Sequence, residues 1–485
     1  MSNAAPSNPE TSPSPNSPSA TGTDATQFTA ELRAALHDPG DPERLEALYR
    51  AAQRPQSASA TPAATFAAVI ENAYRETPGD PLLAAWHYRL QFTPEHRQSS
   101  RNAASWTTAL ALSVALGVGF WLLSDPILTL PGGIPLLALL ISPLTALAII
   151  AFLTITAGPT RRNIIRAALA VVALAAVTTF VLVALQFWVP TAQLRQTYLL
   201  LMLLHLPLLS AAAIGVTLLG LRASSEDAFA FLIKSLEAIG TAGVAALVGG
   251  LFVALTYGMF AALSIELSTP VIRLLVAGGG GLIPVLAVAS IYLPQLPPSE
   301  QEFQHGFARL LLMLVRALLP LALLVLAIYA AVIPFNFFQP FINRDALIIY
   351  NVVLFAVLAL IVTVTPITTE GMSPRLLALL RIGIVVVAAL IAVISLYALA
   401  AILYRTAAGQ LTMNRVTVIG WNVLNIALLV GILIAQFRQG RSATATATGP
   451  ASAAWVAALH RVYRLGMVLY LVWALALTLS LPWLF

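Results

Sequence analysis

Apolar runs of about twenty residues recur from Trp106 to the C-terminus, separated by short polar stretches. A helix of about 20 residues crosses a hydrocarbon core of roughly 30 Å. The runs are apolar on every side, without the period-two alternation of membrane β-strands. The pattern therefore predicts an all-α, polytopic transmembrane helical bundle of about 11 spans. We place the spans near 106–124, 134–157, 167–189, 198–220, 238–263, 271–293, 310–334, 346–366, 382–403, 416–435 and 465–485.

The first hundred residues have a different character. Residues 1–25 are mostly Ser, Pro, Thr, Asn and Ala, and they carry almost no large apolar side chain. Such a segment cannot bury enough surface to offset its chain entropy, so we expect a disordered tail. We interpret residues 26–100 as a small helical cytoplasmic region and residues 101–485 as the transmembrane domain.

A short internal repeat predicts helical hairpins in the N-terminal region. Pro39-Gly40-Asp41-Pro42 recurs as Pro78-Gly79-Asp80-Pro81, and helix-like stretches flank each copy. Asp before Pro suits a helix N-cap followed by Pro at the first helical position. The unit resembles the hairpins of tetratricopeptide-like arrays, although two copies fall short of the usual three. Residues 28–91 are therefore either a cap at the membrane surface or a module that binds a cytoplasmic protein partner.

Composition and charge agree with a membrane protein and indicate its orientation. The chain is 59% hydrophobic and 9% charged, whereas soluble domains are about 25% charged. Most arginines lie in or beside the loops on one side of the membrane. The loops on the other side carry only Arg195, Arg344, Arg405 and Arg415. The positive-inside rule then predicts a cytoplasmic N-terminus and an external C-terminus. The single lysine, Lys234, among many arginines indicates a bacterial coding bias, so we expect a bacterial inner (plasma) membrane protein. The arginines are scattered through the loops between spans, a pattern that reflects membrane topology, so we expect membrane lipids and no nucleic acid as partners.

The common catalytic, phosphate-binding and metal-binding motifs are absent from the sequence. The chain has no cysteine, no H-E-x-x-H zinc motif, no G-x-x-x-x-G-K-[ST] phosphate loop and no G-x-S-x-G nucleophile elbow. The predicted outer loops carry few carboxylates for acid–base or metal chemistry. We therefore do not favour an enzyme, and we expect no cofactor and no metal site.

Two features inside the predicted spans are candidates for a cavity. His205 lies in mid-span, two residues before Pro207, and is either a proton relay or a histidine bonded to a neighbouring helix. The run Gly278, Gly279, Gly280 and Gly281 weakens helix propensity by about 1 kcal/mol per glycine. Either another helix packs closely on this run, or the span is unwound there and lines a cavity or hinge.

Two further features have simpler structural interpretations. Glu266 and Arg273 flank a tight turn between predicted spans, and we expect them to form an ion pair. Gly249 and Gly250 lie in one span, and we expect them to form an ordinary packing surface.

One segment resembles a known family. Tyr404-Arg405, followed by Gly409-Gln410-Leu411-Thr412-Met413-Asn414-Arg415, is similar to an aromatic-Gly-x-Thr-x-x-Arg signature. That signature is found in a bacterial polytopic family catalogued as domain of unknown function 4153. Ala407 and Ala408 depart from the family's aromatic position before the glycine. The resemblance implies a multispan membrane protein and no established activity.

The same segment carries a hypothesis of anion binding. Arg405 and Arg415 lie where positive charge is disfavoured, and a guanidinium matches the geometry of phosphate oxygens. Thr412 is expected to N-cap the next span and add backbone amides. The alternative is that both arginines are neutralised by outer-loop carboxylates such as Asp345 and Glu266.

Two functions remain open on the sequence alone. The first is a transporter-like or lipid-handling membrane protein, which needs a polar cavity near mid-membrane. The second is a non-catalytic membrane scaffold or sensor that acts through its N-terminal helices and has a dry core.

Overall fold

The computed structural model describes residues 31–32, 34–36, 42–52, 62–77, 79–158, 160–220, 223–303, 306–369, 372–443 and 451–485. The chain divides into two compact units, residues 1–103 and 104–485. The predicted disordered tail, residues 1–25, lies outside the described residues, as does the first Pro-Gly-Asp of the repeat.

The first unit is a small helical assembly with its own aromatic core. It contains α2 (Pro42–Ala52), α3 (Pro62–Glu76) and the beginning of α4 (Pro81–Leu123). The rings of Tyr49, Phe66 and Trp86 meet at centroid distances of 5.4–5.5 Å. The Asp80 carboxylate accepts the backbone N–H of Leu82 at 2.8 Å, so the predicted Asp-Pro helix start is confirmed in the second copy of the repeat.

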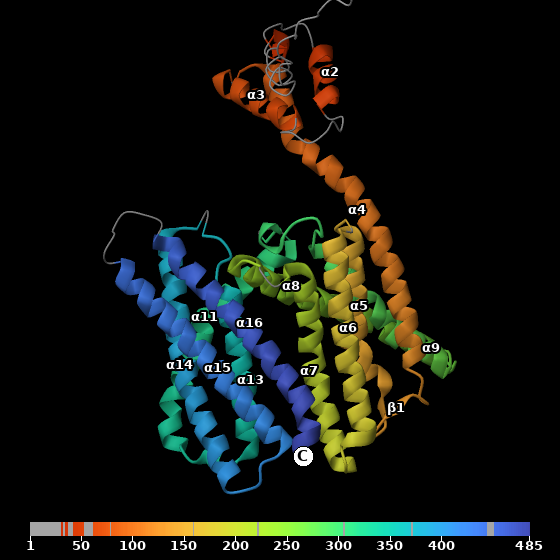
Figure 1. The fold of residues 1–485 in the computed structure, drawn as a ribbon, viewed down its shortest axis with the longest axis vertical. Helices are drawn as coiled ribbons and strands as arrows, with labels where there is room; N and C mark the ends of the chain where they lie inside the picture. Colours follow the sequence, from red (N-terminus) through yellow and green to blue (C-terminus); the bar gives the residue numbers. More distant parts are fainter. Residues whose placement is uncertain are drawn as a thin grey trace, which may run out of the picture. The chain divides into compact units, whose positions relative to one another are not determined.

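The second unit is a bundle of long helices with one short hairpin (Figure 1). Its elements are the rest of α4, β1 (Thr129–Leu130), β2 (Ile134–Pro135), α5 (Leu136–Thr156), α6 (Arg161–Val183), η1 (Ala184–Trp188), α7 (Ala192–Leu219), α8 (Ser225–Ala262), α9 (Thr269–Arg273), η2 (Leu274–Gly278), α10 (Gly279–Ile291), η3 (Pro298–Glu300), α11 (Gly306–Val332), η4 (Ile333–Asn336), α12 (Gln339–Ile342), α13 (Arg344–Val364), α14 (Pro374–Ala407), α15 (Met413–Ala443) and α16 (Ala451–Leu484).

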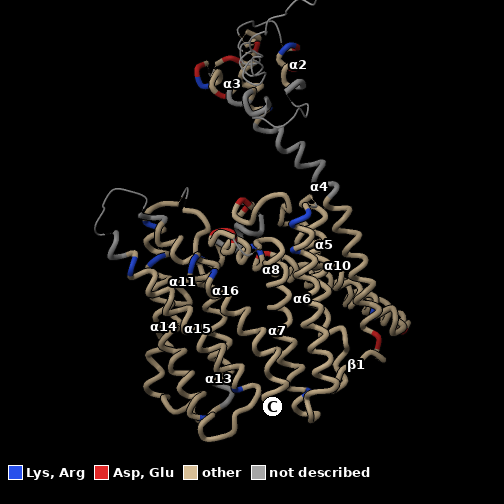
Figure 2. The backbone as a smooth tube through the Cα atoms, in the orientation of Figure 1, with Lys and Arg blue, Asp and Glu red and all other residues tan. Residues whose placement is uncertain are grey.

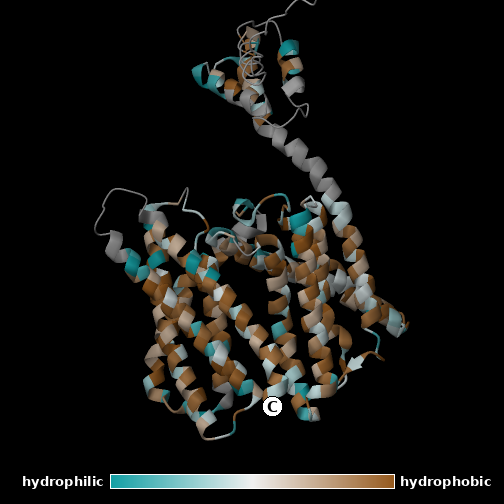
Figure 3. Ribbon diagram, in the orientation of Figure 1, coloured by the Kyte–Doolittle hydropathy of each residue, from teal (hydrophilic) through white to brown (hydrophobic). Residues whose placement is uncertain are grey.

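Eleven helices among the described residues are long and apolar enough to cross a membrane. Each predicted span overlaps one of them, so the predicted fold class is confirmed and the chain is a multi-pass membrane protein. Figure 3 shows the hydrophobic colouring along the lengths of these helices, with hydrophilic residues gathered near their ends. Large apolar side chains such as Leu247 and Val172 are exposed because lipid, rather than protein, covers them.

Polar caps fix where several spans begin. The side chains of Thr160, Thr191, Ser224 and Ser373 each accept a backbone N–H three residues later. Each cap satisfies one of the amides that a helix leaves unpaired in its first turn. Each of these four helices thus begins directly after a single capping Ser or Thr residue.

Three large apolar clusters form most of the core of the bundle. One lies among α8, α11, α13, α14, α15 and α16, and includes Ile384 and Leu429. A second joins α6, α7, α15 and α16 around Tyr198 and Met202. A third joins α4, α5 and α10 around Phe152 and Val285. α15 and α16 contribute to the first two clusters, so they connect the two sides of the bundle.

Helix α8 differs from the prediction in length and in packing. It spans 38 residues, and its buried residues all lie between Ala228 and Glu237. Apart from the adjoining backbone of α8 and the neighbouring residues in sequence, no described heavy atom lies within 4 Å of a Cβ built at Gly249 or Gly250. The predicted packing surface at these glycines is therefore wrong, because no neighbouring helix among the described residues packs closely on either position.

Candidate functional site

His205 lies on α7 with both ring nitrogens in hydrogen-bonding contact. Its side chain is 1% exposed, and Nδ1 lies 2.7 Å from the carbonyl oxygen of Leu201. The indole N–H of Trp421, on α15, donates to Nε2 at 3.2 Å. Since Nε2 accepts, Nδ1 carries the proton, and the imidazole is neutral. This geometry agrees with the interpretation of His205 as a histidine bonded to a neighbouring helix.

Asn422 and Asn425 closely follow Trp421, the hydrogen-bond donor to His205, along α15. They are 1% and 0% exposed, and their three-residue spacing places them on one face of the helix. Asn422 Nδ2 donates to Asn351 Oδ1 on α13 at 2.6 Å and to the Val418 carbonyl at 2.9 Å. The hydroxyl of Tyr470, on α16, donates to Asn425 Oδ1.

Each asparagine keeps one buried polar atom without a partner among the described residues. These atoms are Asn422 Oδ1 and Asn425 Nδ2. A buried polar atom left unpaired costs about 1–3 kcal/mol, so such atoms generally face water or a ligand. At 1.5 Å per residue, Asn425 lies about 18 Å from Met413, the first residue of α15, which is a depth near the middle of a membrane. The structure thus places incomplete hydrogen bonding at membrane depth.

The six residues His205, Asn351, Trp421, Asn422, Asn425 and Tyr470 are here called the asparagine cluster. They come from four helices, α7, α13, α15 and α16. The rings of Trp421 and Tyr470 meet edge to face with centroids 5.1 Å apart. Sequence reasoning identified only His205 as a site residue. The sequence gives a signal for Asn422 and Asn425 as well, because they are two polar residues three positions apart inside an apolar span.

The glycine run is helical and closely packed rather than unwound. A Cβ built at Gly281 would lie 2.7 Å from the Cα of Gly117 on α4. A Cβ built at Gly117 would lie 2.8 Å from the carbonyl oxygen of Gly278. Nothing lies within 4 Å of a Cβ built at Gly279 or Gly280. The hinge or cavity interpretation is not supported, because two glycines of the run admit the backbone of another helix.

The structure does not bring the glycine run and His205 into one site. The contacts of the glycine run are with α4, whereas His205 contacts α15. Of the two predicted cavity features, only His205 belongs to the asparagine cluster.

Arg405, Thr412 and Arg415 hold the loop before α15. Thr412 Oγ1 accepts the backbone N–H of Arg415 at 3.4 Å, which fits the predicted N-cap. Arg415 donates to the Gln410 carbonyl at 2.5 Å, and Arg405 donates to the Ile342 carbonyl at 2.8 Å. Among the described side chains, no carboxylate pairs with either arginine. The anion site stays a prediction, while the loop contacts give both arginines a structural role.

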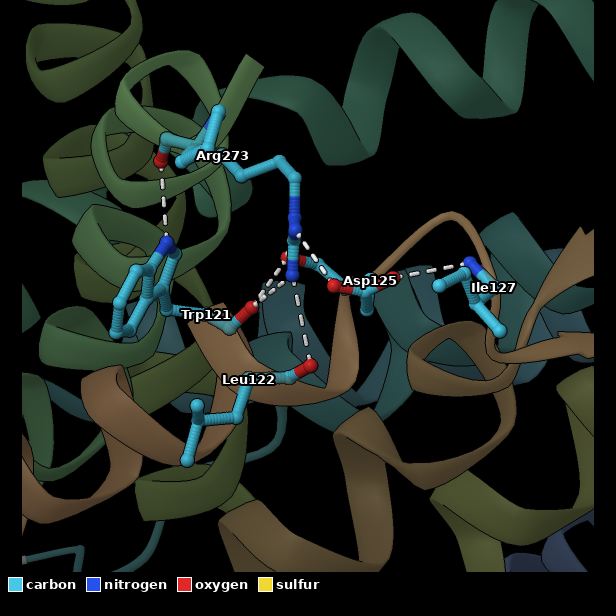
Figure 4. A network of polar contacts seen from close by, with 7 residues as sticks. Trp121, Leu122, Asp125, Ile127 and Arg273 are labelled. Carbon is cyan, nitrogen blue, oxygen red and sulfur yellow. Dashed lines mark hydrogen bonds and ion pairs between the residues drawn. The ribbon is translucent and has the colours of Figure 1, made fainter. Parts of the chain in front are cut away.

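The predicted pair of Glu266 and Arg273 is wrong. Arg273 instead lies 3.0 Å from Asp125 and also donates to the Trp121 carbonyl (Figure 4). It donates to Ser124 Oγ as well. The indole N–H of Trp121 returns a bond to the Pro270 carbonyl at 3.0 Å. The arginine thereby ties the end of α4 to α9, contacts that local sequence spacing does not reveal.

The Asp125 carboxylate is held in its charged form. The backbone N–H of Ile127 and the Arg273 guanidinium lower the pKa of Asp125. A carboxylate that accepts such donors stays ionised at neutral pH. This exposed pair therefore has a structural role at the ends of α4 and α9.

Lys234, the chain's one lysine, forms a buried ion pair on α8. Its Nζ lies 2.9 Å from Glu237 Oε2, and the side chains are 4% and 6% exposed. Nζ also donates to the carbonyls of Ile291 at 3.2 Å and Glu302 at 2.5 Å. Glu237 Oε2 accepts no well-directed hydrogen bond, so its contact with Lys234 is an ion pair. Lysine thus joins α8 to the segment after α10.

Hydrogen bonds from neighbouring polar residues reinforce this junction. Asp227 accepts from Ser299 Oγ at 2.6 Å, and Gln301 bonds both the N–H and the carbonyl of Leu293. Within the described part of the chain, no group of three His, Cys, Asp or Glu residues is arranged to hold a metal ion.

Comparison with known proteins gives no relative. No family model, no curated protein and no solved structure matches the chain.

Proposed function

We propose that this chain is a transporter-like membrane protein that binds a small polar molecule in the middle of its membrane domain. The supporting observation is the pair of unpartnered, buried atoms on Asn422 and Asn425. The bonds of the two asparagines to Asn351 and Tyr470 also hold α15 to α13 and α16, but they leave Asn422 Oδ1 and Asn425 Nδ2 unused, and a binding site needs such free donors and acceptors. The polar residues come from four helices, as expected for a site between the parts of a transporter.

The absence of cysteine from the chain allows a direct test of water access. We expect Asn425→Cys, in native membranes, to react with a small water-soluble methanethiosulfonate. The reaction should be at least about tenfold faster than that of Leu429→Cys, because the reactive thiolate needs water to form. Leu429 is a matched control, being one turn further along α15 and 0% exposed. Equal, slow labelling would indicate a dry core and favour the scaffold or sensor alternative.

We also propose the orientation and location predicted above, with the N-terminus in the cytoplasm and the chain in the bacterial inner membrane. Figure 2 supports it, since Lys and Arg gather at one end of the bundle and are sparse at the other. A membrane-impermeant maleimide should label Gln193→Cys from outside intact cells and Glu226→Cys only after the inner face is opened. The reverse pattern would overturn the orientation.

The signature around Arg405 and Arg415 is compatible with membership of the uncharacterised family named above, and this stays a proposal. The second unit's extensive apolar surface makes lipids its expected surroundings. The N-terminal unit, with its own aromatic core, remains the candidate surface for a cytoplasmic protein partner.

A further inference from the structure

We infer that the asparagine cluster takes a neutral carboxamide-type solute, which uses one N–H donor and one carbonyl acceptor to bridge Asn422 and Asn425. This inference rests on the proposed function and assigns a substrate class to the same site. It follows from three properties of the cluster: the hydrogen-bonding atoms without a partner, the spacing of the two asparagines and the absence of charged residues.

The orientation of the Asn422 amide is fixed by its neighbours. Its Nδ2 faces two acceptors, Asn351 Oδ1 at 2.6 Å and the Val418 carbonyl at 2.9 Å. Turning the amide over would place its oxygen against both acceptors, which is repulsive. The free atom on Asn422 is therefore the acceptor Oδ1, and a ligand must supply a donor to it.

Asn425 supplies the complementary hydrogen-bond donor. Its Oδ1 accepts from Tyr470, and its Nδ2 carries two N–H donors without a partner among the described residues. Residues three apart on a helix have Cβ atoms about 5–6 Å apart. A carboxamide carries both an N–H donor and a C=O acceptor. One molecule can therefore donate to Asn422 Oδ1 and accept from Asn425 Nδ2 across that spacing.

The cluster excludes charged molecules by its composition. None of its six residues is Asp, Glu, Lys or Arg. His205 has its Nε2 lone pair engaged by the Trp421 N–H, so protonation would cost that hydrogen bond. A charge moved from water into this site would meet no counter-charge, which is far more costly than moving a neutral amide.

A pair of probes with the same shape tests this class. The purified full chain in proteoliposomes is given radiolabelled acetamide or acetamidinium, and uptake is compared with empty liposomes. Acetamide has an acceptor and donors and is neutral, whereas acetamidinium has only donors and is charged. We expect acetamide uptake above the empty-liposome rate and no added uptake of acetamidinium.

Three variants separate ligand contacts from folding. Asn422→Leu and the double variant Asn425→Leu/Tyr470→Phe should each lower protein-dependent acetamide uptake at least about tenfold, since each removes a bridging bond. The double variant leaves no orphaned hydroxyl, so its thermal stability should match the parent. Thr417→Val is the control, because Thr417 is buried on α15 and bonds only the Met413 carbonyl of its own helix.

The outcomes are distinct. Equal added uptake of acetamidinium, or full acetamide uptake by the double variant, would overturn the substrate class. No uptake of acetamide, together with rapid labelling of Asn425→Cys, would also overturn the class while leaving the proposed function standing. No uptake together with no labelling would overturn both.

Discussion

Gly281→Ala is expected to destabilise the membrane domain by about 3 kcal/mol, at the upper end of the usual cost of overpacking. The added Cβ would lie 2.7 Å from the Cα of Gly117, 2.9 Å from its nitrogen and 3.0 Å from the Leu116 carbonyl oxygen. All three are backbone atoms, so no side-chain rotation relieves the overlap, and α4 and α10 must separate. The free energy of unfolding in detergent micelles measures this loss.

Gly280→Ala is the matched control for this prediction. Nothing lies within 4 Å of a Cβ built at Gly280. The substitution should therefore leave stability unchanged or raise it by up to about 1 kcal/mol through helix propensity. If both alanine variants lose the same stability, or neither does, the close packing of Gly281 on Gly117 is not what holds these helices together.

Lys234→Met is expected to cost about 3–5 kcal/mol, because it leaves the Glu237 carboxylate buried without its counter-charge. The two groups lie 2.9 Å apart and are almost fully buried. The double variant Lys234→Met/Glu237→Leu removes both charges and should recover most of that loss. Recovery should be incomplete, since the carbonyls of Ile291 and Glu302 still lose their donor. Unfolding free energies of the parent and both variants check this.

A double variant as unstable as Lys234→Met would contradict this account of the pair. It would show that the lysine acts mainly through its two backbone acceptors. Glu237→Leu alone is also informative, because it leaves Lys234 with those acceptors and with the Phe303 ring 4.7 Å away. That variant should therefore be less destabilised than Lys234→Met.

The span count was predictable because apolar length is a local property of the sequence. Where boundaries were missed, polar residues inside a helix were responsible. The fifth predicted span begins near 238, whereas α8 begins at Ser225, because Asp227, Lys234 and Glu237 make the first turns of this helix polar. Asp227 and Lys234 bond residues about 57–72 positions later in the chain, and no local pattern contains that information.

The candidate site was predictable only in part for the same reason. His205 was visible as an ionisable residue in an apolar run, but its donor, Trp421, lies 216 positions away. Asn422 and Asn425 were visible as polar residues, yet their unused atoms emerge only once Asn351 and Tyr470 are placed. The glycine run left two interpretations open because the choice depends on Gly117, in another helix.

The pairing of Arg273 shows how a local assumption failed. Sequence proximity favoured Glu266, seven positions away, whereas the structure supplies Asp125 across 148 positions. Arginine offers five donors, and the chain segment at the end of α4 presents a carboxylate, a hydroxyl and a carbonyl together. A single carboxylate next to Arg273 in sequence could not match that set.

The central claim is that the asparagine cluster holds a non-protein molecule at membrane depth. A high-resolution experimental map of the purified full chain tests it most directly. We predict density within hydrogen-bonding distance of both Asn422 Oδ1 and Asn425 Nδ2 that no protein atom accounts for. A well-resolved map with protein groups bonded to both atoms, and no such density, would contradict the claim.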